Sequence, residues 1–252
     1  MTVFQFVILG LIQGITEFLP ISSSGHLVLL GSLFGLEETL LVSILLHVAT
    51  LCSVVVVMRG ELVHLLKNPF SKEMKKLAIS TIVTLCIVLM IYGFAKNSYI
   101  EEYLPLFFMV TATMLVATEV LLKNKKTQTE ITMRQSLFVG IAQGFAIFPG
   151  VSRSGTTICV GMLAGGAREK VTKFSFLLSI PIILASMLME VIELSKTKEI
   201  LSFNLSGMIL GFVTAFLVGI FALKIMIKAT SKIKFGYFAI YLIALSIVLL
   251  II

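Results

Sequence analysis

The chain has 252 residues, of which 58% are hydrophobic and 13% are charged, and its mean hydropathy is +1.08. A soluble core needs far fewer apolar residues, so the composition excludes an ordinary soluble domain and indicates an integral membrane protein. The formal net charge of +7 is explained by contact with anionic membrane lipids. We therefore expect lipids as partners and no nucleic acid.

The first interruption of the apolar pattern runs from residue 13 to residue 26, in the sequence QGITEFLPISSSGH. Pro20 disfavours helical geometry in the residue before it and lacks a backbone donor, so the helical run Val3 to Phe18 must stop there. A second helix must begin after the proline. Ser22 or Ser23 can cap this helix, and its free N–H groups then point into the break, where they favour an anion such as phosphate.

Several side chains of this first break are costly in a membrane, which indicates function. Glu17 follows Gln13 by four residues on one helix face, and either metal coordination or acid–base catalysis would suit it. His26 lies one turn into the second helix beside Glu17 and is expected to be catalytic. Three serines in a row, Ser22 to Ser24, exceed the need for one N-cap.

A second break repeats the first at a constant offset of 130 residues, with only the proline shifted by one. It runs from Gly140 to Thr156, and Gln143, Phe148, Ser152, Ser154 and Gly155 fall on Gln13, Phe18, Ser22, Ser24 and Gly25. Three positions differ in chemistry: Glu17, Ser23 and His26 become Ile147, Arg153 and Thr156. This pattern indicates a duplication whose two copies have specialised.

Three apolar stretches of about the 20 residues that a bilayer requires follow each break. These six predicted spans are Thr39 to Met58, Leu77 to Ala95, Leu104 to Leu122, Lys173 to Leu194, Leu205 to Leu223 and Phe235 to Ile252. The motif pieces, such as Ser136 to Phe148, reach only about 20 Å and cannot cross a core of about 30 Å. We therefore expect two re-entrant helix pairs.

The predicted fold is an all-α integral membrane protein with six full spans and an inverted-topology duplication. A re-entrant pair enters and leaves on one side, and three spans separate it from the next pair, so the two copies have opposite orientations. Repeat one covers about residues 1–122 and repeat two about residues 135–252, within one membrane domain.

The basic residues test this arrangement, because Lys and Arg concentrate in cytoplasmic connections. Sixteen belong to the connections assigned to the cytoplasm: Arg59, Lys67, Lys72, Lys75, Lys76, Lys123, Lys125, Lys126, Arg134, Arg168, Lys170, Lys173, Lys224, Lys228, Lys232 and Lys234. The outer connections hold only Lys96, Lys196 and Lys198. Arg153 alone is left in the membrane, where it needs an anionic partner such as Glu17 or a substrate phosphate.

With these motifs the chain resembles the bacitracin-resistance type of undecaprenyl-diphosphate phosphatase, a bacterial inner-membrane family, over essentially its whole length. The family's first signature is matched by Gln13, Glu17, Pro20, Ser22, Ser23, Gly25 and His26, and its second by Pro149, Gly150, Ser152, Arg153, Ser154 and Thr157. The chain departs from other members at Gln13, where they carry Glu.

The resemblance implies hydrolysis of a C55 polyprenyl diphosphate to the monophosphate carrier of peptidoglycan precursors, in the bacterial cytoplasmic membrane with the site open to the outer face. It implies a divalent cation, Mg²⁺ or Ca²⁺, held by Glu17 and Gln13. Glu17, Ser23, His26 and Arg153 would be catalytic, and Ser22, Ser24, Gly25, Ser152, Ser154 and Thr157 would bind the substrate. A homodimer is a further expectation.

Two questions stay open in the sequence. The attacking group could be Ser23 activated by His26, which we favour, His26 itself, or metal-bound water. A secondary transporter or lipid flippase is the alternative function, because broken helices in inverted repeats are typical of transporters. The presence of Glu17, Ser23 and His26 in one copy only favours an enzyme, since a catalytic constellation is needed once.

Overall fold

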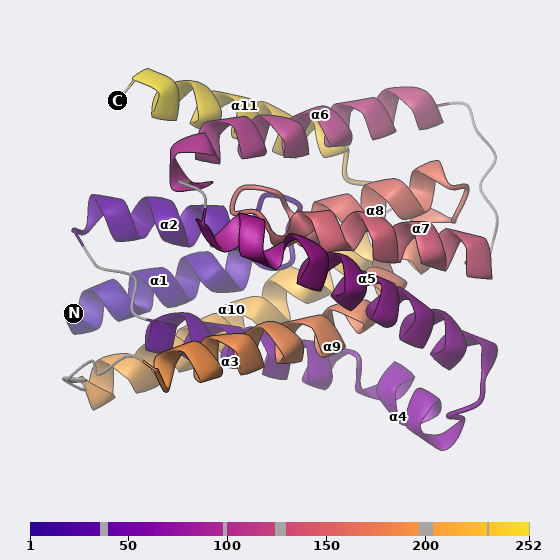
Figure 1. Cartoon of the computed structure of the whole chain (residues 1–252), viewed down its shortest axis with the longest axis horizontal. Coiled ribbons are helices and arrows are strands. Elements are labelled where there is room, and N and C mark those ends of the chain that lie inside the picture. Colours follow the sequence, from indigo (N-terminus) through magenta and orange to yellow (C-terminus); the bar gives the residue numbers. More distant parts are fainter. Residues whose placement is uncertain (36–39, 98–99, 124–129, 197–203, 231, 252) are drawn as a thin grey trace.

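The computed structural model describes residues 1–35, 40–97, 100–123, 130–196, 204–230 and 232–251, and in this part of the chain the fold is all helical (Figure 1). The first half contains α1 Val3–Thr16, α2 Ser23–Leu33, α3 Leu40–Val57, α4 Arg59–Lys67, α5 Lys72–Asn97, the 3-10 helix η1 Ile100–Tyr103 and α6 Leu104–Leu122. The second half contains α7 Met133–Gly144, the 3-10 helix η2 Phe145–Ile147, α8 Arg153–Leu163, α9 Arg168–Leu194, α10 Leu205–Ala229 and α11 Phe235–Ile251.

Five helices of the described chain are long and apolar enough to cross a membrane, namely α3, α5, α6, α9 and α10. The sixth predicted span is the apolar helix α11, which has 17 residues and reaches about 26 Å at the usual rise. Helices α5 and α9 begin at Lys72 and Arg168, earlier than the predicted Leu77 and Lys173. Long basic side chains allow this, because they can reach water while their stems stay on the helix.

The two motif regions fold into short helix pairs, as the sequence predicts. Helices α1, α2, α7 and α8 have 14, 11, 12 and 11 residues, too short for a bilayer core of about 30 Å. Helix α1 ends at Thr16, and Glu17 is its C-cap, so the first break opens slightly earlier than the predicted end at Phe18. Figure 1 shows the two pairs entering the bundle from opposite ends, with their tips meeting inside it.

Matching caps begin the helices of the two short pairs. Thr2 and Gln5 form a capping box at the start of α1, and Thr132 and Gln135 form the same box at the start of α7. Helices α2 and α8 also start alike, because Ser22 and Ser152 each accept a hydrogen bond from the backbone N–H three residues later. Each pair of equivalent residues is 130 positions apart, which is the offset seen in the sequence.

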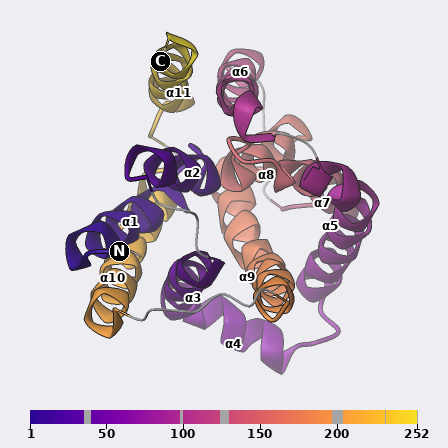
Figure 2. The ribbon, with the colours of Figure 1, turned by 60° about the vertical axis from the view of Figure 1, so that its left-hand side comes forward.

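Each short helix pair packs on a long helix from the other half of the chain. Helix α1 lies along α10, and its counterpart α7 lies along α5, while α3 contacts α9 and α6 contacts α11 between the halves (Figure 2). Glycines permit the close approach, since a Cβ on Gly10 would collide with the backbone of Gly211 and one on Gly140 would lie 2.7 Å from the carbonyl oxygen of Ser80. The two halves of the chain therefore pack closely backbone to backbone.

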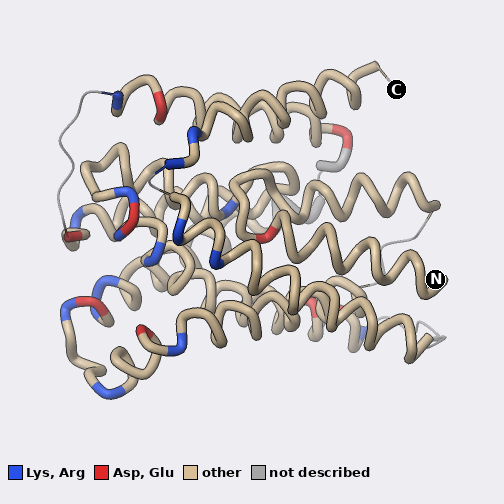
Figure 3. Tube along the Cα trace, turned by 180° about the vertical axis from the view of Figure 1, so that it is seen from behind, with Lys and Arg blue, Asp and Glu red and all other residues tan. Residues whose placement is uncertain are grey.

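The basic residues gather at one end of the bundle, opposite the end that carries both termini (Figure 3). This end holds the connections from α3 to α5, from α8 to α9 and from α10 to α11. These connections belong to the set that the sequence assigns to a single side of the membrane; Lys125 and Lys126 of that set, and Lys198 of the opposite one, lie outside the described residues. The bundle thus has one basic end.

The glycine contact between α1 and α10 gives a stability prediction. Gly10→Ala should lower the thermal midpoint in detergent, because the added methyl group forces two helix backbones apart and overpacking costs about 1–3 kcal/mol. Gly60→Ala is the matched control, since a Cβ at Gly60 in α4 meets nothing within 4 Å. Alanine favours a helix over glycine, so the control should hold or raise the midpoint. Equal midpoints for the two variants would contradict the close packing.

Candidate active site

The two helix-pair tips meet and hydrogen-bond to each other at the centre of the bundle. The backbone N–H of Gly150 donates to the hydroxyl of Ser22 at 3.1 Å, and the hydroxyl of Ser154 donates to the carbonyl of Leu19 at 3.0 Å. Ser22 has a positive φ of 68°, which a non-glycine residue adopts only where surrounding contacts hold it. The polar tips are therefore fixed against each other.

Glu17 is the residue on which both tips converge. Its side chain is 4% exposed, and one carboxylate oxygen accepts hydrogen bonds from the hydroxyl of Ser23 at 2.5 Å and from the amide of Gln13 at 3.1 Å. The other oxygen forms an ion pair with the guanidinium of Arg153. Ser23 and Arg153 are the first residues of α2 and α8, so equivalent positions of the two copies meet at one carboxylate.

This arrangement is suited to an anion with several oxygen atoms. Arg153 remains 18% exposed at its side chain, and a guanidinium carries five N–H donors that match phosphate oxygens. Helices α2 and α8 begin at the same junction, so the partial positive charges of two helix N-termini reinforce the guanidinium. The single buried carboxylate beside them can accept a proton from a neighbouring hydroxyl.

His26 lies in the tip but its ring nitrogens bond residues other than Ser23. Its Nδ1 lies 2.7 Å from the carbonyl oxygen of Ser22, and its Nε2 lies 2.7 Å from the hydroxyl of Tyr241. Because a carbonyl only accepts, the neutral ring carries its proton on Nδ1 and accepts from the tyrosine. The Tyr241 ring is stacked on the imidazole with ring centroids 5.7 Å apart. The expected Ser23–His26 pair is thus not formed, and Ser23 bonds Glu17 instead.

The remaining predicted site residues build the tips. The hydroxyls of Ser22 and Ser152 cap their helices, and each lies 3.3 Å from the hydroxyl of the serine two positions on, Ser24 or Ser154. Thr157 bonds Ser175 of α9 at 2.5 Å. Gly25 is required by the close approach of the tips, since a Cβ there would lie 2.7 Å from the ring of Phe108 and 2.9 Å from the nitrogen of Gly150.

The oxygen atoms around Glu17 fit one side of a site for a hard divalent cation. The carbonyl oxygen of the Gln13 side chain is fully buried and has no hydrogen-bond partner among the described residues. It belongs to the same side chain that bonds Glu17. The described part of the chain contains no group of three His, Cys, Asp or Glu that could hold a metal alone. A cation here would need oxygens from a ligand, as Mg²⁺ commonly does.

Two residues of the site could not be found from the sequence. Thr111 of α6 accepts from the N–H of Ser152 at 3.0 Å and donates to the carbonyl of Gly150 at 2.9 Å, so it holds the second tip. Tyr241 of α11 holds His26 from 215 positions away in the chain. Both residues lie in long apolar stretches with no motif around them, and only the packing of α6 and α11 beside the tips brings them in.

The chain is similar to known proteins over nearly its whole length. The family model described as bacitracin resistance protein BacA matches residues 6–248. An undecaprenyl-diphosphatase of Carboxydothermus hydrogenoformans is 37% identical over 254 residues, which cover 100% of this chain and 97% of the relative. One from Thermosipho africanus is 40% identical, covering 96% of this chain and 97% of the relative, and one from Bacteroides thetaiotaomicron is 37% identical, covering 94% of each.

The contacts of Thr111 give a prediction for the second tip. Thr111→Val keeps the side-chain shape but leaves two buried backbone groups unpaired, which costs about 1–3 kcal/mol each, so the thermal midpoint should fall. Thr113→Val on the same helix is the matched control, because Thr113 is exposed and bonds only the carbonyl of Met109 in its own helix. A midpoint as high for Thr111→Val as for the control would show that this threonine does not hold the tip.

Proposed function

The chain belongs to the bacitracin resistance protein BacA family, and on this premise we propose that its Glu17–Arg153 junction removes the terminal phosphate from undecaprenyl diphosphate. The protein is then an undecaprenyl-diphosphatase, an enzyme that releases undecaprenyl phosphate and inorganic phosphate. This reaction returns the lipid carrier to peptidoglycan synthesis and confers resistance to bacitracin. The observation that carries the proposal is the pairing of one buried carboxylate with Arg153 and Ser23 at the starts of two facing helices.

Arg153 is proposed to bind the diphosphate. The guanidinium is paired with Glu17, and a diphosphate can take over part of that pairing because its oxygens fit the planar fork. Phosphoryl transfer depends mainly on positioning and on stabilisation of charge that spreads over the phosphate oxygens. Arg153 and the two helix N-termini supply both, in a membrane environment that strengthens electrostatic interactions.

Ser23 is proposed as the attacking group, with Glu17 as its base. The carboxylate accepts a hydrogen bond from the Ser23 hydroxyl, with the two oxygen atoms 2.5 Å apart, so it can take the hydroxyl proton while the serine oxygen attacks the terminal phosphorus. The bond from phosphorus to the bridging oxygen then breaks, and undecaprenyl phosphate leaves with the electron pair. Water hydrolyses the phosphoserine, which restores the hydroxyl and releases inorganic phosphate.

His26 is proposed as a second acid–base group. Its ring is fixed by Ser22 and Tyr241 on either side, so its orientation does not depend on Ser23. It lies one turn after Ser22 at the start of α2, and the attacking water of the second step would take the place of the Tyr241 hydroxyl at Nε2 and give its proton to that nitrogen. Ser24, Ser154 and Thr157 remain proposed contributors to phosphate binding, together with the capping serines Ser22 and Ser152 and with Gly25, which keeps the tips close.

A divalent cation, Mg²⁺ or Ca²⁺, is proposed to bind with the substrate. Glu17 and the unpartnered amide oxygen of Gln13 would hold it, and a bound cation would neutralise charge on the diphosphate oxygens. Gln13 is suited to this role because an amide oxygen is also a hard ligand. Its amide nitrogen orients the carboxylate of Glu17 in either case.

The membrane arrangement is proposed to be an inverted repeat with α11 as a sixth span. The basic end then faces the cytoplasm, the first helix pair dips in from the outside, and both termini lie outside. This arrangement is supported by the opposite entry of the two helix pairs and by the single basic end (Figures 1 and 3). We place the protein in the bacterial cytoplasmic membrane, with the catalytic junction open to the outer face.

The proposed function is tested by phosphate release from undecaprenyl diphosphate by the purified chain in detergent. Arg153→Ala should lower the turnover about 10²–10³-fold, which is typical for loss of one group that stabilises transition-state charge. Arg153→Lys keeps the charge that Glu17 needs but loses the planar fork, so it should also be impaired at least about tenfold. Arg134→Ala, which removes an exposed arginine of α7, is the matched control and should keep native turnover.

Near-native turnover in both Arg153 variants would remove this residue from the site. Transport is the competing function, since broken helices in opposed repeats are the architecture of many transporters. Movement of lipid or solute in liposomes without any phosphate release by the native chain would decide for transport.

The identity of the attacking group is tested by rapid quench with substrate labelled in the terminal phosphate. The native chain and His26→Ala should accumulate an acid-stable, base-labile phosphoserine, and Ser23→Ala should not. Ser32→Ala, at an exposed position of the same helix, is the control and should behave as native. An acid-labile phosphoenzyme would indicate His26 as the nucleophile, and the absence of any phosphoenzyme with full turnover would indicate attack by water.

The proposed orientation predicts which introduced thiols are accessible from outside the cell. On a background without Cys52, Cys86 and Cys159, Lys72→Cys at the basic end should escape an impermeant reagent in intact cells and react after lysis. Ser206 is exposed at the start of α10, at the other end of the bundle. The thiol of Ser206→Cys should react in intact cells and also after lysis. The reverse pattern would mean that the basic end faces outward.

A further inference from the structure

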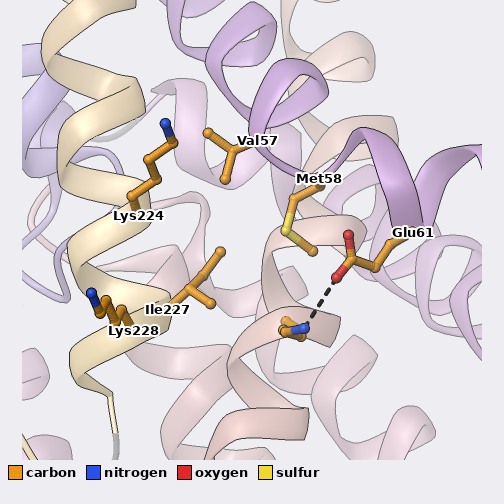
Figure 4. Close-up of a pocket in the computed structure, with 7 residues that line it drawn as sticks. Val57, Met58, Glu61, Lys224, Ile227 and Lys228 are labelled. Atoms are coloured by element: carbon orange, nitrogen blue, oxygen red, sulfur yellow. Dashed lines mark hydrogen bonds and ion pairs between the residues drawn. The ribbon is translucent and has the colours of Figure 1, made fainter.

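A cavity of about 360 Å³ lies at the basic end of the bundle, away from the Glu17–Arg153 junction. Its walls come from the end of α3, the start of α4, and from α9 and α10 (Figure 4). Lys173, Lys224 and Lys228 line it together with a single carboxylate, that of Glu61. Three positive charges and one negative charge therefore share this space.

The charges of the cavity are only partly compensated. Lys173 of α9 donates to the carboxylate of Glu61 at 3.1 Å, so these two groups neutralise each other. Lys224 and Lys228 lie one turn apart on α10, and no carboxylate of the described residues forms an ion pair with either. Like charges at this spacing repel each other, so an anion between α10 and α4 would relieve the repulsion.

Basic residues at this end also follow from the orientation of a membrane protein, so their presence alone shows no binding site. Lys72 and Lys75 of α5, for example, are exposed at the same end, as Lys173, Lys224 and Lys228 are, but they are not among the residues that line this cavity. The difference is that Lys173, Lys224 and Lys228 line one open hollow, in which Val57, Met58 and Ile227 form an apolar wall beside them. A ligand with a negatively charged group joined to an apolar chain would match these lysines and this apolar wall.

We propose that this cavity is a second anion site, which binds a phosphate group at the level of the lipid headgroups. Lysine ammonium groups bind phosphate as point charges with several donors, and basic pockets between helices at the cytoplasmic side of membrane proteins bind anionic lipid headgroups. The phosphate can belong to an anionic phospholipid or be free phosphate. The site shares no residue with the catalytic junction and does not depend on the proposed function.

The test measures binding of dioctanoyl phosphatidylglycerol to the purified full chain in a non-ionic detergent by native mass spectrometry. Lys224→Ala/Lys228→Ala should weaken binding roughly fivefold for each lysine removed, the usual effect of one basic residue near an anionic lipid. Lys72→Ala/Lys75→Ala removes the same charge from the same end and should leave the dissociation constant within about twofold of native. Dioctanoyl phosphatidylcholine, which has equal chains and no net charge, should bind weakly to all three proteins.

Glu61→Gln provides a variant with the opposite expected effect. It removes the only carboxylate of the lining and frees Lys173, so phosphatidylglycerol should bind several-fold more tightly than to the native chain. A gain of affinity cannot result from misfolding. Turnover and the thermal midpoint of each variant should stay near native, because none of these residues lies in the catalytic junction.

Competition with inorganic phosphate separates the two sources of the ligand. Displacement of the lipid at millimolar phosphate, seen in the native chain and lost in Lys224→Ala/Lys228→Ala, would assign the cavity to free phosphate; persistence of the lipid would assign it to a headgroup. Equal weakening by the α10 and α5 double variants, or no weakening by either, would overturn the proposal. The lysines would then act only as general surface charge.

Discussion

The carboxylate of Glu17 holds the two halves of this protein together at their centre. It accepts from Ser23 of the first tip and pairs with Arg153 of the second. Two charges in a membrane-embedded junction are expensive to desolvate, and removing one partner of such a pair typically costs about 3–5 kcal/mol because the other charge is stranded. The intact pair therefore adds little net free energy to folding, because the cost of desolvating both charges offsets their attraction. The pair holds the Arg153 guanidinium at the junction, where only another anion can take the place of the Glu17 carboxylate.

The junction requires the tips to stay in register, and the surrounding helices provide this. Helices gain little from apolar burial against one another in lipid, so close backbone packing carries much of their association. The contact of Gly10 with Gly211, and its counterpart at Gly140 and Ser80, join each short pair to a long helix of the other half. Because each short pair packs on a long helix of the other half of the chain, neither half can shift without moving the junction.

The two helix-pair tips carry different chemistry at positions that match in the sequence. Ser23 and Arg153 occupy equivalent positions, and the counterpart of Glu17 is Ile147. A symmetric protein would place two carboxylates or two guanidinium groups face to face, and like charges repel strongly in a medium of low dielectric. Because the two tips differ at these positions, they form an ion pair, Glu17 with Arg153, beside the hydroxyl of Ser23. The caps at Ser22 and Ser152, which carry no charge, have stayed the same in both copies.

Much of this follows from the sequence alone. The apolar composition, the offset of 130 residues and the short pieces around Pro20 and Pro149 predict a helical membrane protein with two broken helix pairs, since each rests on local chemistry or chain length. The isolated charges in apolar surroundings also mark Glu17 and Arg153, because an ionisable group in lipid needs a partner. What the sequence could not decide was which side chains pair. Ser23 turns to Glu17 and His26 turns to Tyr241, and Thr111 holds the second tip from a different helix. The last two choices depend on how α11 and α6 lie beside the tips, and no periodicity within a segment encodes the distance between segments that are far apart in the chain, 215 positions for His26 and Tyr241.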